Sequence, residues 1–126
     1  MYRCALAALA VAASIAPATA QQIARNFPQN ALRGALVVEA PPEIMLNGRP
    51  ARLAPGARIR GQDNLLQMSA ALVGQHLLVN YTLDPLGLVY DVWILRQDEA
   101  DKKPWPVKLE QTTWTFDPVA QTWTKP

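Results

Sequence analysis

Runs of apolar residues of strand length, separated by turn signals, dominate the chain after residue 33. The two clearest runs are 75–83 and 88–96, joined by Asp84-Pro85-Leu86-Gly87. Proline fixes φ as such a turn requires, and glycine accepts the positive φ that follows. A hairpin with this four-residue loop places its alternate apolar side chains on one buried face. The predicted cross-strand pairs are Leu83 with Leu88, Tyr81 with Tyr90, Val79 with Val92 and Leu77 with Ile94.

Shorter runs predict further strands before this hairpin. Residues 34–39 form a first strand, which Pro41-Pro42 ends. Asn47-Gly48 is the strongest two-residue hairpin signal, because both residues accept the positive φ of a type I′ turn. Pro50 cannot donate a ladder hydrogen bond, so this arm is expected at a sheet edge. The predicted pairs are Ile44 with Ala51 and, as opposite charges, Glu43 with Arg52.

The stretch between the two hairpins predicts shorter elements. Pro55-Gly56 is predicted as a turn, and residues 57–61 as a short strand after it. Residues 63–72 fit two elements. Apolar residues at helical spacing, with Asp63 as a cap, favour a helix, and a short strand is the alternative.

The last part of the chain changes in character. Residues 97–103 are a charged run, and Pro104-Trp105-Pro106 makes the chain after it stiff and extended. Threonine and aromatic residues then fill 107–124, which predicts a second hairpin that turns at Asp117-Pro118. In this hairpin the aromatic side chains share one face, and the predicted pairs are Phe116 with Gln121 and Trp114 with Trp123.

The first residues have the pattern of a cleavable export signal. Arg3 is the one charge at the start, an alanine-rich apolar run follows, and Ala18-Thr19-Ala20 offers the small residues that a signal peptidase requires. The run is shorter than the ~20 apolar residues that a membrane-spanning helix needs. We therefore expect residues 1–20 to be a signal peptide, cleaved near Ala20, and the mature chain to be periplasmic or secreted.

Composition limits what stabilises the mature chain and what it attracts. Cleavage leaves 106 of the 126 residues and removes the only cysteine, so packing alone must hold one domain together. The 11 basic and 10 acidic residues that remain give a net charge of +1, and so no general attraction to nucleic acid or anionic membrane. The mature chain offers no second segment long enough to span a membrane. Its ten prolines argue against long helices.

Several turn and strand motifs resemble those of a known class of barrels. They are Leu46-Asn47-Gly48, the strand from Pro55 to Gly61, Val73-Gly74, and the hairpin from Asp84 that ends in Trp93-Ile94-Leu95. Residues 44–95 thereby resemble small exported bacterial β-barrel domains of the OB type, and the whole chain looks like uncharacterised small exported proteobacterial proteins. The resemblance implies a fold and no particular ligand, since OB-type barrels bind many unrelated partners.

We therefore predict a mainly β protein, a small five-stranded OB-like barrel with a C-terminal β-hairpin extension and little helix after the signal peptide. The expected organisation is a signal peptide over 1–20, a leader over 21–33, the OB-like β domain over 34–96, a charged and proline-rich linker over 97–106 and an aromatic hairpin over 107–126.

Residues suited to catalysis or metal binding are sparse. His76 is the only histidine, and zinc needs three or four side-chain ligands that the mature chain does not offer. Ser69 lacks the glycine elbow of many serine hydrolases. We expect no catalytic residues, no metal and no cofactor. The carboxylates fit a solvated run at Asp98, Glu99 and Asp101, and turns bonded to their own backbone at Asp84 and Asp117.

Two groups of side chains are candidates for binding. One is aromatic and suits a protein or glycan partner, unless the hairpin folds back and buries it: Trp105, Trp114, Phe116 and Trp123. The other is a set of arginines with no acid among them, which suits an anionic ligand or, as the alternative, keeps a sheet edge soluble: Arg49, Arg52, Arg58 and Arg60.

The leading interpretation is a non-enzymatic exported binding module whose ligand is an envelope protein or a glycan. The alternatives are an envelope enzyme or enzyme accessory that uses His76, and a polyanion binder that uses the 49–60 arginines. The sequence leaves the oligomeric state open.

Overall fold

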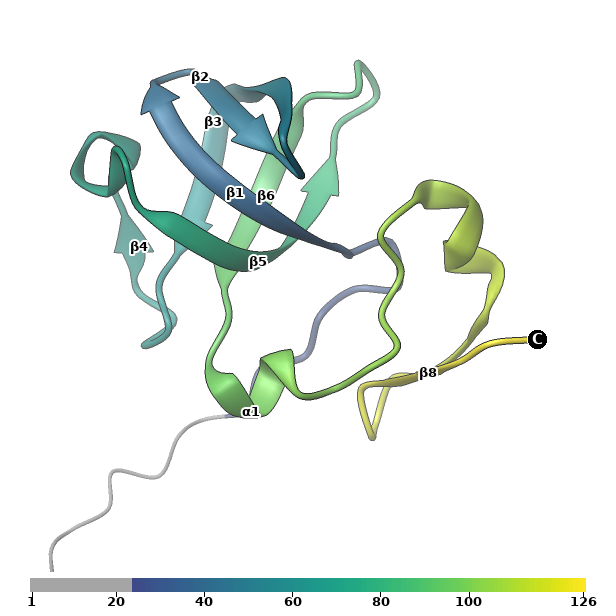
Figure 1. Cartoon of the computed structure of the whole chain (residues 1–126). Coiled ribbons are helices and arrows are strands. Elements are labelled where there is room, and N and C mark those ends of the chain that lie inside the picture. The colour runs from purple at the N-terminus through teal and green to yellow at the C-terminus, as the bar shows by residue number, and fades with distance from the viewer. Residues whose placement is uncertain (1–23) are drawn as a thin grey trace, which may run out of the picture.

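The computed structural model describes residues 24–126, and the expected signal peptide lies outside the described residues. Figure 1 shows a barrel of strands with a smaller C-terminal segment packed beside it. The elements are β1 (Leu32–Ala40), β2 (Glu43–Leu46), β3 (Arg49–Arg60), β4 (Leu66–Gln67), the 3₁₀ helix η1 (Ser69–Leu72), β5 (His76–Leu83), β6 (Val89–Ile94), α1 (Gln97–Ala100), the 3₁₀ helix η2 (Leu109–Thr113), β7 (Thr115–Asp117) and β8 (Thr122–Thr124).

Five strands pair into a closed ring. β1 pairs with β2, β2 with β3, β3 with β6, β6 with β5, and β5 with β1. The β3–β6 pairing is parallel, and the other four are antiparallel. The mainly β, OB-like barrel predicted from the sequence is thus confirmed, and β4 is added outside the ring, at the end of β3.

The interior of the barrel holds an apolar core that all five strands supply. Alternate residues of each strand point inward, as the two-residue period of a β-strand requires. The 3₁₀ helix η1 also contributes one side chain. The buried members are Leu32, Leu36, Val38, Ile44, Leu53, Ile59, Leu72, Val79, Tyr81, Val89 and Val92.

The hairpin at Asn47-Gly48 is confirmed. Both residues have positive φ, 53° and 77°, and the strands pair in the predicted register, with Ile44 opposite Ala51. The side chain of Asn47 also accepts the backbone N–H of Ala35 at 2.9 Å. This residue therefore shapes its own turn and ties the hairpin to β1.

The predicted register of the β5–β6 hairpin is wrong by two residues. Tyr81 lies opposite Val92, not Tyr90. One residue of the offset arises in the loop, because the backbone of Asp84 and Leu88 hydrogen-bonds across it and leaves three residues in the turn. The other arises from a bulge between Tyr81 and Leu83. The one-residue offset at the loop turns Tyr90 out of the barrel, and the bulge returns Val92 to the interior.

Two further expectations for the middle of the chain need correction. Pro55-Gly56 is not a turn between strands, because β3 runs through it. Gly56 has φ of +78°, and the register of the β3–β6 pairing shifts between Leu53 and Arg58. Pro55-Gly56 therefore forms an irregularity within one long strand. Residues 63–72 contain both a two-residue strand and one short 3₁₀ helix, so each of the two expected elements accounts for part of this stretch.

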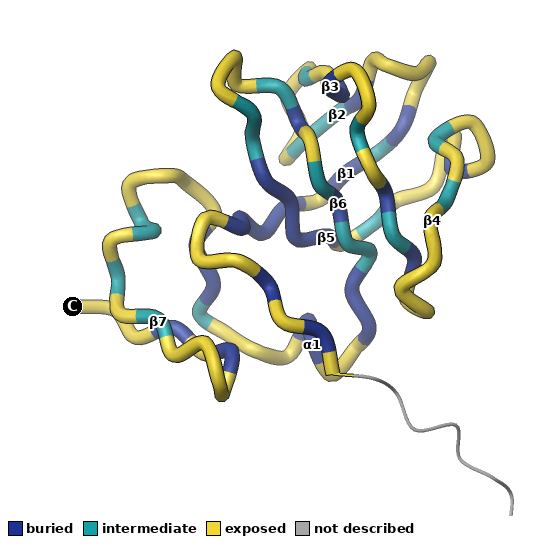
Figure 2. The backbone as a smooth tube through the Cα atoms, turned by 180° about the vertical axis from the view of Figure 1, so that it is seen from behind, coloured by how far each residue is buried: buried dark blue, intermediate teal, exposed yellow. Residues whose placement is uncertain are grey.

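The C-terminal segment forms a second core against the outside of the barrel, together with the residues before β1. Its buried members are Phe27, Ala31, Leu95, Ala100, Trp105 and Trp123. The buried stretches on both sides of this contact are visible in Figure 2. Among residues 24–126, the structure has no helix of the length and apolarity needed to cross a membrane.

The predicted register of the C-terminal hairpin is also wrong by two residues. Phe116 lies opposite Trp123, not Gln121. The turn takes up four residues because Asp117 accepts the N–H groups of Val119 and Ala120, and Gln121 has φ of +56°. Both Asp84 and Asp117 bond their own backbone, as predicted.

Candidate functional site

The leader and the charged run are joined by a buried ion pair. Glu99, at 4% exposure, accepts two hydrogen bonds from Arg25, one of them 2.9 Å long from Nε. Arg25 also donates to the carbonyl oxygens of Gly61 and Ile94, at 2.8 and 2.7 Å. The prediction that Glu99 is solvated is therefore wrong. Its carboxylate stabilises α1 against the barrel.

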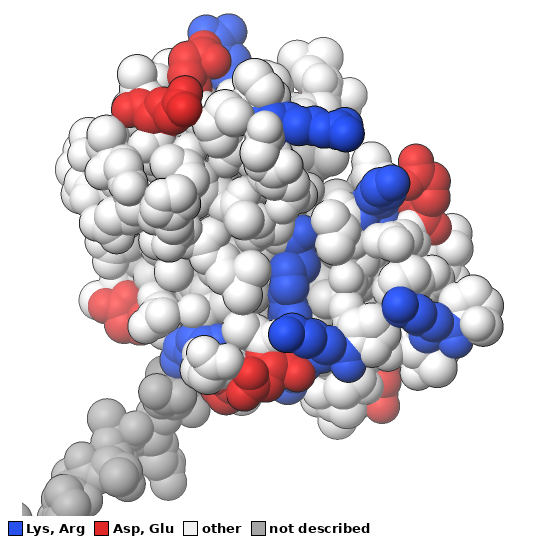
Figure 3. Space-filling model, viewed as in Figure 1, with Lys and Arg blue, Asp and Glu red and all other residues white. Residues whose placement is uncertain are grey.

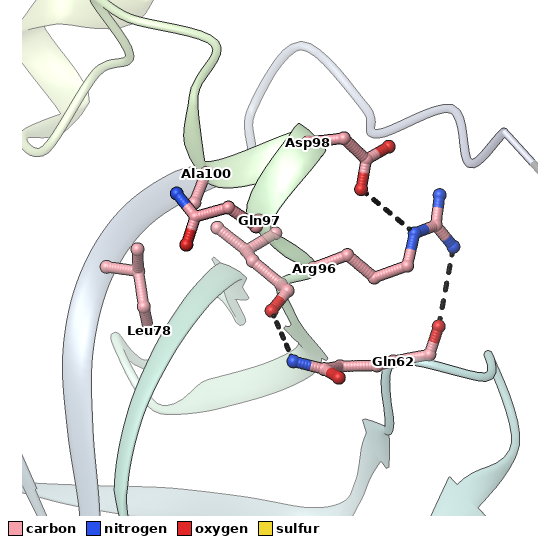
Figure 4. Close-up of a pocket in the computed structure, with 7 residues that line it drawn as sticks. Gln62, Leu78, Arg96, Gln97, Asp98 and Ala100 are labelled. Atoms are coloured by element: carbon pink, nitrogen blue, oxygen red, sulfur yellow. Dashed lines mark hydrogen bonds and ion pairs between the residues drawn. The ribbon is translucent and has the colours of Figure 1, made fainter. Parts of the chain in front are cut away.

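A groove of about 450 Å³ lies beside α1. Figure 4 shows the residues that line it, among them Gln62 and Leu78. Its polar groups bond one another. Arg96 donates to Asp98 at 3.2 Å and to the carbonyl oxygen of Gln62 at 3.4 Å, and it contacts Glu99 at 3.7 Å. The hydrogen bond from Arg96 also lowers the pKa of the Asp98 carboxyl. Because these groups bond one another, the groove is best explained as a structural joint.

A second buried arginine holds the start of β1 against the C-terminal segment. Arg33 donates to the carbonyl oxygens of Glu99, Ala100 and Lys102, and its guanidinium lies 4.9 Å from the ring centre of Trp105. Burial lowers the pKa of Arg33 to about 10, against the opposing charge of Glu99. Its partners are backbone and core groups, so this arginine is structural.

The four aromatic residues of the C-terminal region do not gather on a surface. Trp105 and Trp123 are 5% and 4% exposed, and their ring centres lie 6.0 Å apart. Phe116 packs on Trp123 at 4.6 Å, and Trp114 lies at the rim of the same core. These rings therefore supply the apolar area that joins the hairpin to the barrel.

The four arginines of β3 are not brought together either. Arg49, Arg52 and Arg58 are exposed at separate points along the strand. Arg52 pairs with Glu43 at 3.1 Å, and Arg60 lies 3.9 Å from Asp91. Figure 3 shows basic side chains scattered over one face, with several along the seam between the barrel and the C-terminal segment. The structure thus offers no single anion site on β3.

The remaining sequence candidates stand apart from one another. His76 is exposed at the start of β5, and Ser69 begins η1. Within residues 24–126 no group of three or more His, Cys, Asp and Glu side chains is arranged to hold a metal ion.

A second groove, of about 490 Å³, lies beside the β5–β6 hairpin. We call it the hairpin groove. The segment before β1 forms one wall, and β5, β6 and their loop form the other. Its lining residues are Pro28, Asn30, Thr82, Leu83, Asp84, Pro85, Tyr90 and Asp91.

The hairpin groove combines an aromatic ring with oxygen acceptors. Tyr90 is 38% exposed, whereas its neighbour Val89 is 1% exposed in the barrel core. Thr82 accepts the backbone N–H of Asp91 at 3.2 Å, which fixes the bulge and the outward position of Tyr90. Asp84 accepts the N–H groups of Leu86 and Leu88 at 2.9 and 2.8 Å, and so fixes the loop at the end of the groove.

Sequence reasoning missed this groove because it placed Tyr90 on the buried face. The signal that could have found it is Thr82, a hydroxyl residue able to bond the opposite strand beside a tight turn. Pro28 and Asn30 lie in the expected leader, which the structure packs against the barrel. Comparison with known proteins adds no constraint: no family model matches the chain, and no curated protein or solved structure is significantly similar to it.

Proposed function

We propose that this protein is an exported, non-enzymatic module of the cell envelope that binds a neutral glycan in the hairpin groove. The observation that carries the proposal is an exposed tyrosine ring, Tyr90, in a groove flanked by carboxylates and an amide. Pyranose rings present an apolar face that stacks on aromatic side chains, and hydroxyl groups that donate to carboxylate and amide oxygens. The groove offers both kinds of contact.

The volume and the charge of the groove support a sugar ligand. About 490 Å³ lies within the range of small-molecule sites, which is roughly 300–1,000 Å³. Its charged lining groups are Asp84 and Asp91, both acidic, and this favours a neutral ligand over a polyanion. The apolar wall of Pro28, Leu83 and Pro85 covers the side of a sugar ring that carries no hydroxyl group.

The proposal that the chain is exported is based on the signal-peptide pattern of residues 1–20. An exported chain meets the polysaccharides of the envelope. The sequence left the partner open between an envelope protein and a glycan. The proposal takes the glycan, with Tyr90 in place of the C-terminal aromatic residues.

Titration calorimetry with two neutral glycans, N-acetylglucosamine oligomers and glucose oligomers, tests the proposal. The chain without residues 1–20 is expected to bind, and Tyr90→Ala to weaken binding at least about tenfold, which corresponds to about 1.4 kcal/mol. Tyr90→Phe keeps the ring and is expected to retain most of the affinity. Leu86→Ala is the matched control, because Leu86 is 84% exposed on the same loop and does not line the groove.

The result that contradicts the proposal is equal affinity of the parent chain and Tyr90→Ala, with both folded by circular dichroism. Absence of binding to either glycan also contradicts it. Loss of binding in His76→Ala with Tyr90→Ala unaffected would favour the alternative that uses His76. Binding that falls steeply with salt would favour the polyanion alternative.

A further inference from the structure

We infer that the chain forms a symmetric dimer through the free edge of β4 and the apolar side chains around it. We call this surface the β4 patch, and its members are Leu65, Leu66, Met68 and Val73. The inference does not depend on the hairpin groove, which is lined by other residues.

The β4 patch exposes an unusual amount of apolar surface. Leu65, Leu66 and Met68 are 64%, 66% and 77% exposed, and Val73 beyond η1 is 50% exposed. Single exposed apolar residues are common on protein surfaces, whereas a contiguous group of them marks an interaction site. Leu65, Leu66 and Met68 fall within four consecutive positions, so their exposed apolar surface lies in one short stretch of the chain.

The charge pattern favours a second copy of the chain as the partner. From Asn64 to Leu83 the sequence has no Lys, Arg, Asp or Glu. Figure 3 shows a broad surface without charged side chains on the side that carries η1 and the start of β5, with an acidic group at its lower edge. Two copies that meet across a twofold axis place like residues together, so a charged surface repels itself and this one does not.

The backbone geometry points to the same partner. β4 pairs with β3 on one side, Leu66 opposite Arg60 and Gln67 opposite Ile59, and it ends the strand order of its sheet. Figure 2 shows β4 at the periphery of the barrel. Within the described residues its outer edge has no strand beside it. An edge strand left this way pairs with another edge strand, and antiparallel pairing of β4 with β4 is compatible with twofold symmetry.

Natural edge strands are commonly protected by being very short, by charge, by proline or by a covering segment. β4 is very short, but Leu65, Leu66, Gln67 and Met68 carry neither charge nor proline. The association we infer would itself cover the edge. Since β4 is only two residues long, most of the binding free energy must come from the apolar side chains rather than from backbone hydrogen bonds.

Sedimentation equilibrium of the chain without residues 1–20 tests the inference. We expect a monomer–dimer equilibrium over about a hundredfold range of concentration. The double variant Leu66→Lys/Met68→Lys is expected to be monomeric throughout, because each dimer would bring four lysines together. Both side chains are mostly exposed, so circular dichroism should show an unchanged fold. Leu86→Lys and Val119→Lys, at positions 84% and 92% exposed elsewhere, are the controls and should still dimerise.

Cross-linking supplies an independent measurement. The only cysteine of the chain is Cys4, so a single new cysteine in the chain without residues 1–20 reacts alone. A short bismaleimide should join two copies of Met68→Cys and leave Val119→Cys uncoupled. A parent chain that is monomeric at every concentration overturns the inference, as does a dimer that survives Leu66→Lys/Met68→Lys.

Discussion

Replacing Glu99 with glutamine tests how the fold tolerates buried charge. Glu99 lies in α1, and its carboxylate is the counter-charge of Arg25 in the residues before β1. The two side chains are 5% and 4% exposed. Glutamine keeps the shape of the side chain and removes the negative charge, so Arg25 stays buried without its ion-pair partner.

The expected loss in the free energy of unfolding is about 3–5 kcal/mol, the usual effect of removing one partner of a buried pair. The carbonyl oxygens of Gly61 and Ile94 still accept hydrogen bonds from Arg25, which places the estimate toward the lower end. For a domain of this size each kcal/mol lowers the melting temperature by about 4–8 °C. The loss is a large share of the ~5–15 kcal/mol that stabilises a typical protein.

Urea unfolding followed by tryptophan fluorescence measures this loss. Asp98→Asn is the control in the same helix, because the Asp98 side chain is 59% exposed and its pair with Arg96 should contribute at most about 1 kcal/mol. The double variant Arg25→Met/Glu99→Leu removes both charges and should recover part of the stability. The recovery is partial because the N–H of Arg96 and the carbonyl oxygens of Gly61 and Ile94 lose their partners. A loss below about 1 kcal/mol in Glu99→Gln refutes the reasoning, because it would mean that water reaches the pair.

Two further predictions concern the two cores. Burial raises the pKa of the Tyr81 hydroxyl above its usual value of 10, so at alkaline pH this group ionises in the unfolded chain before it does in the folded chain. The free energy of unfolding is therefore full below pH 10 and falls as the pH rises beyond it. Urea unfolding at alkaline pH should show a smaller fall in Tyr81→Phe. Trp123→Ala should lower the free energy of unfolding by about 3–5 kcal/mol, because it opens a cavity among Trp105, Phe116 and Phe27. Val119→Ala, on the exposed turn, should have little effect. Equal melting temperatures of the two variants would contradict the view that the hairpin stabilises the fold.

The parts of the fold that sequence predicted are those set by local chemistry. Asn47-Gly48 specifies a turn geometry by itself, so the register of β2 and β3 follows from counting outward. The apolar runs of strand length were enough to indicate a mainly β fold, since each strand needs one covered face. The barrel itself was expected from the resemblance of the turn and strand motifs to OB-type domains.

The parts that sequence did not predict depend on contacts between distant segments. The one-residue offset at the loop after Leu83 moved Tyr90 from the interior to the hairpin groove. No pattern of apolar residues distinguishes the two registers, because both faces of β6 are largely apolar. Glu99 lies in a charged run of the sequence, which predicts that it is solvated. Its burial follows from Arg25, 74 residues away.

The irregularity at Pro55-Gly56 has a consequence for where the barrel opens locally. When any strand detaches from a closed ring, the hydrogen-bonded pairings on both of its sides are lost, so the ring unfolds cooperatively. Partial opening is expected to begin where one of these pairings is already interrupted. The β3–β6 ladder is interrupted between Leu53 and Arg58. Amide protons beside this gap should exchange with solvent earlier than those of β1 and β5, whose pairing is continuous over six residues.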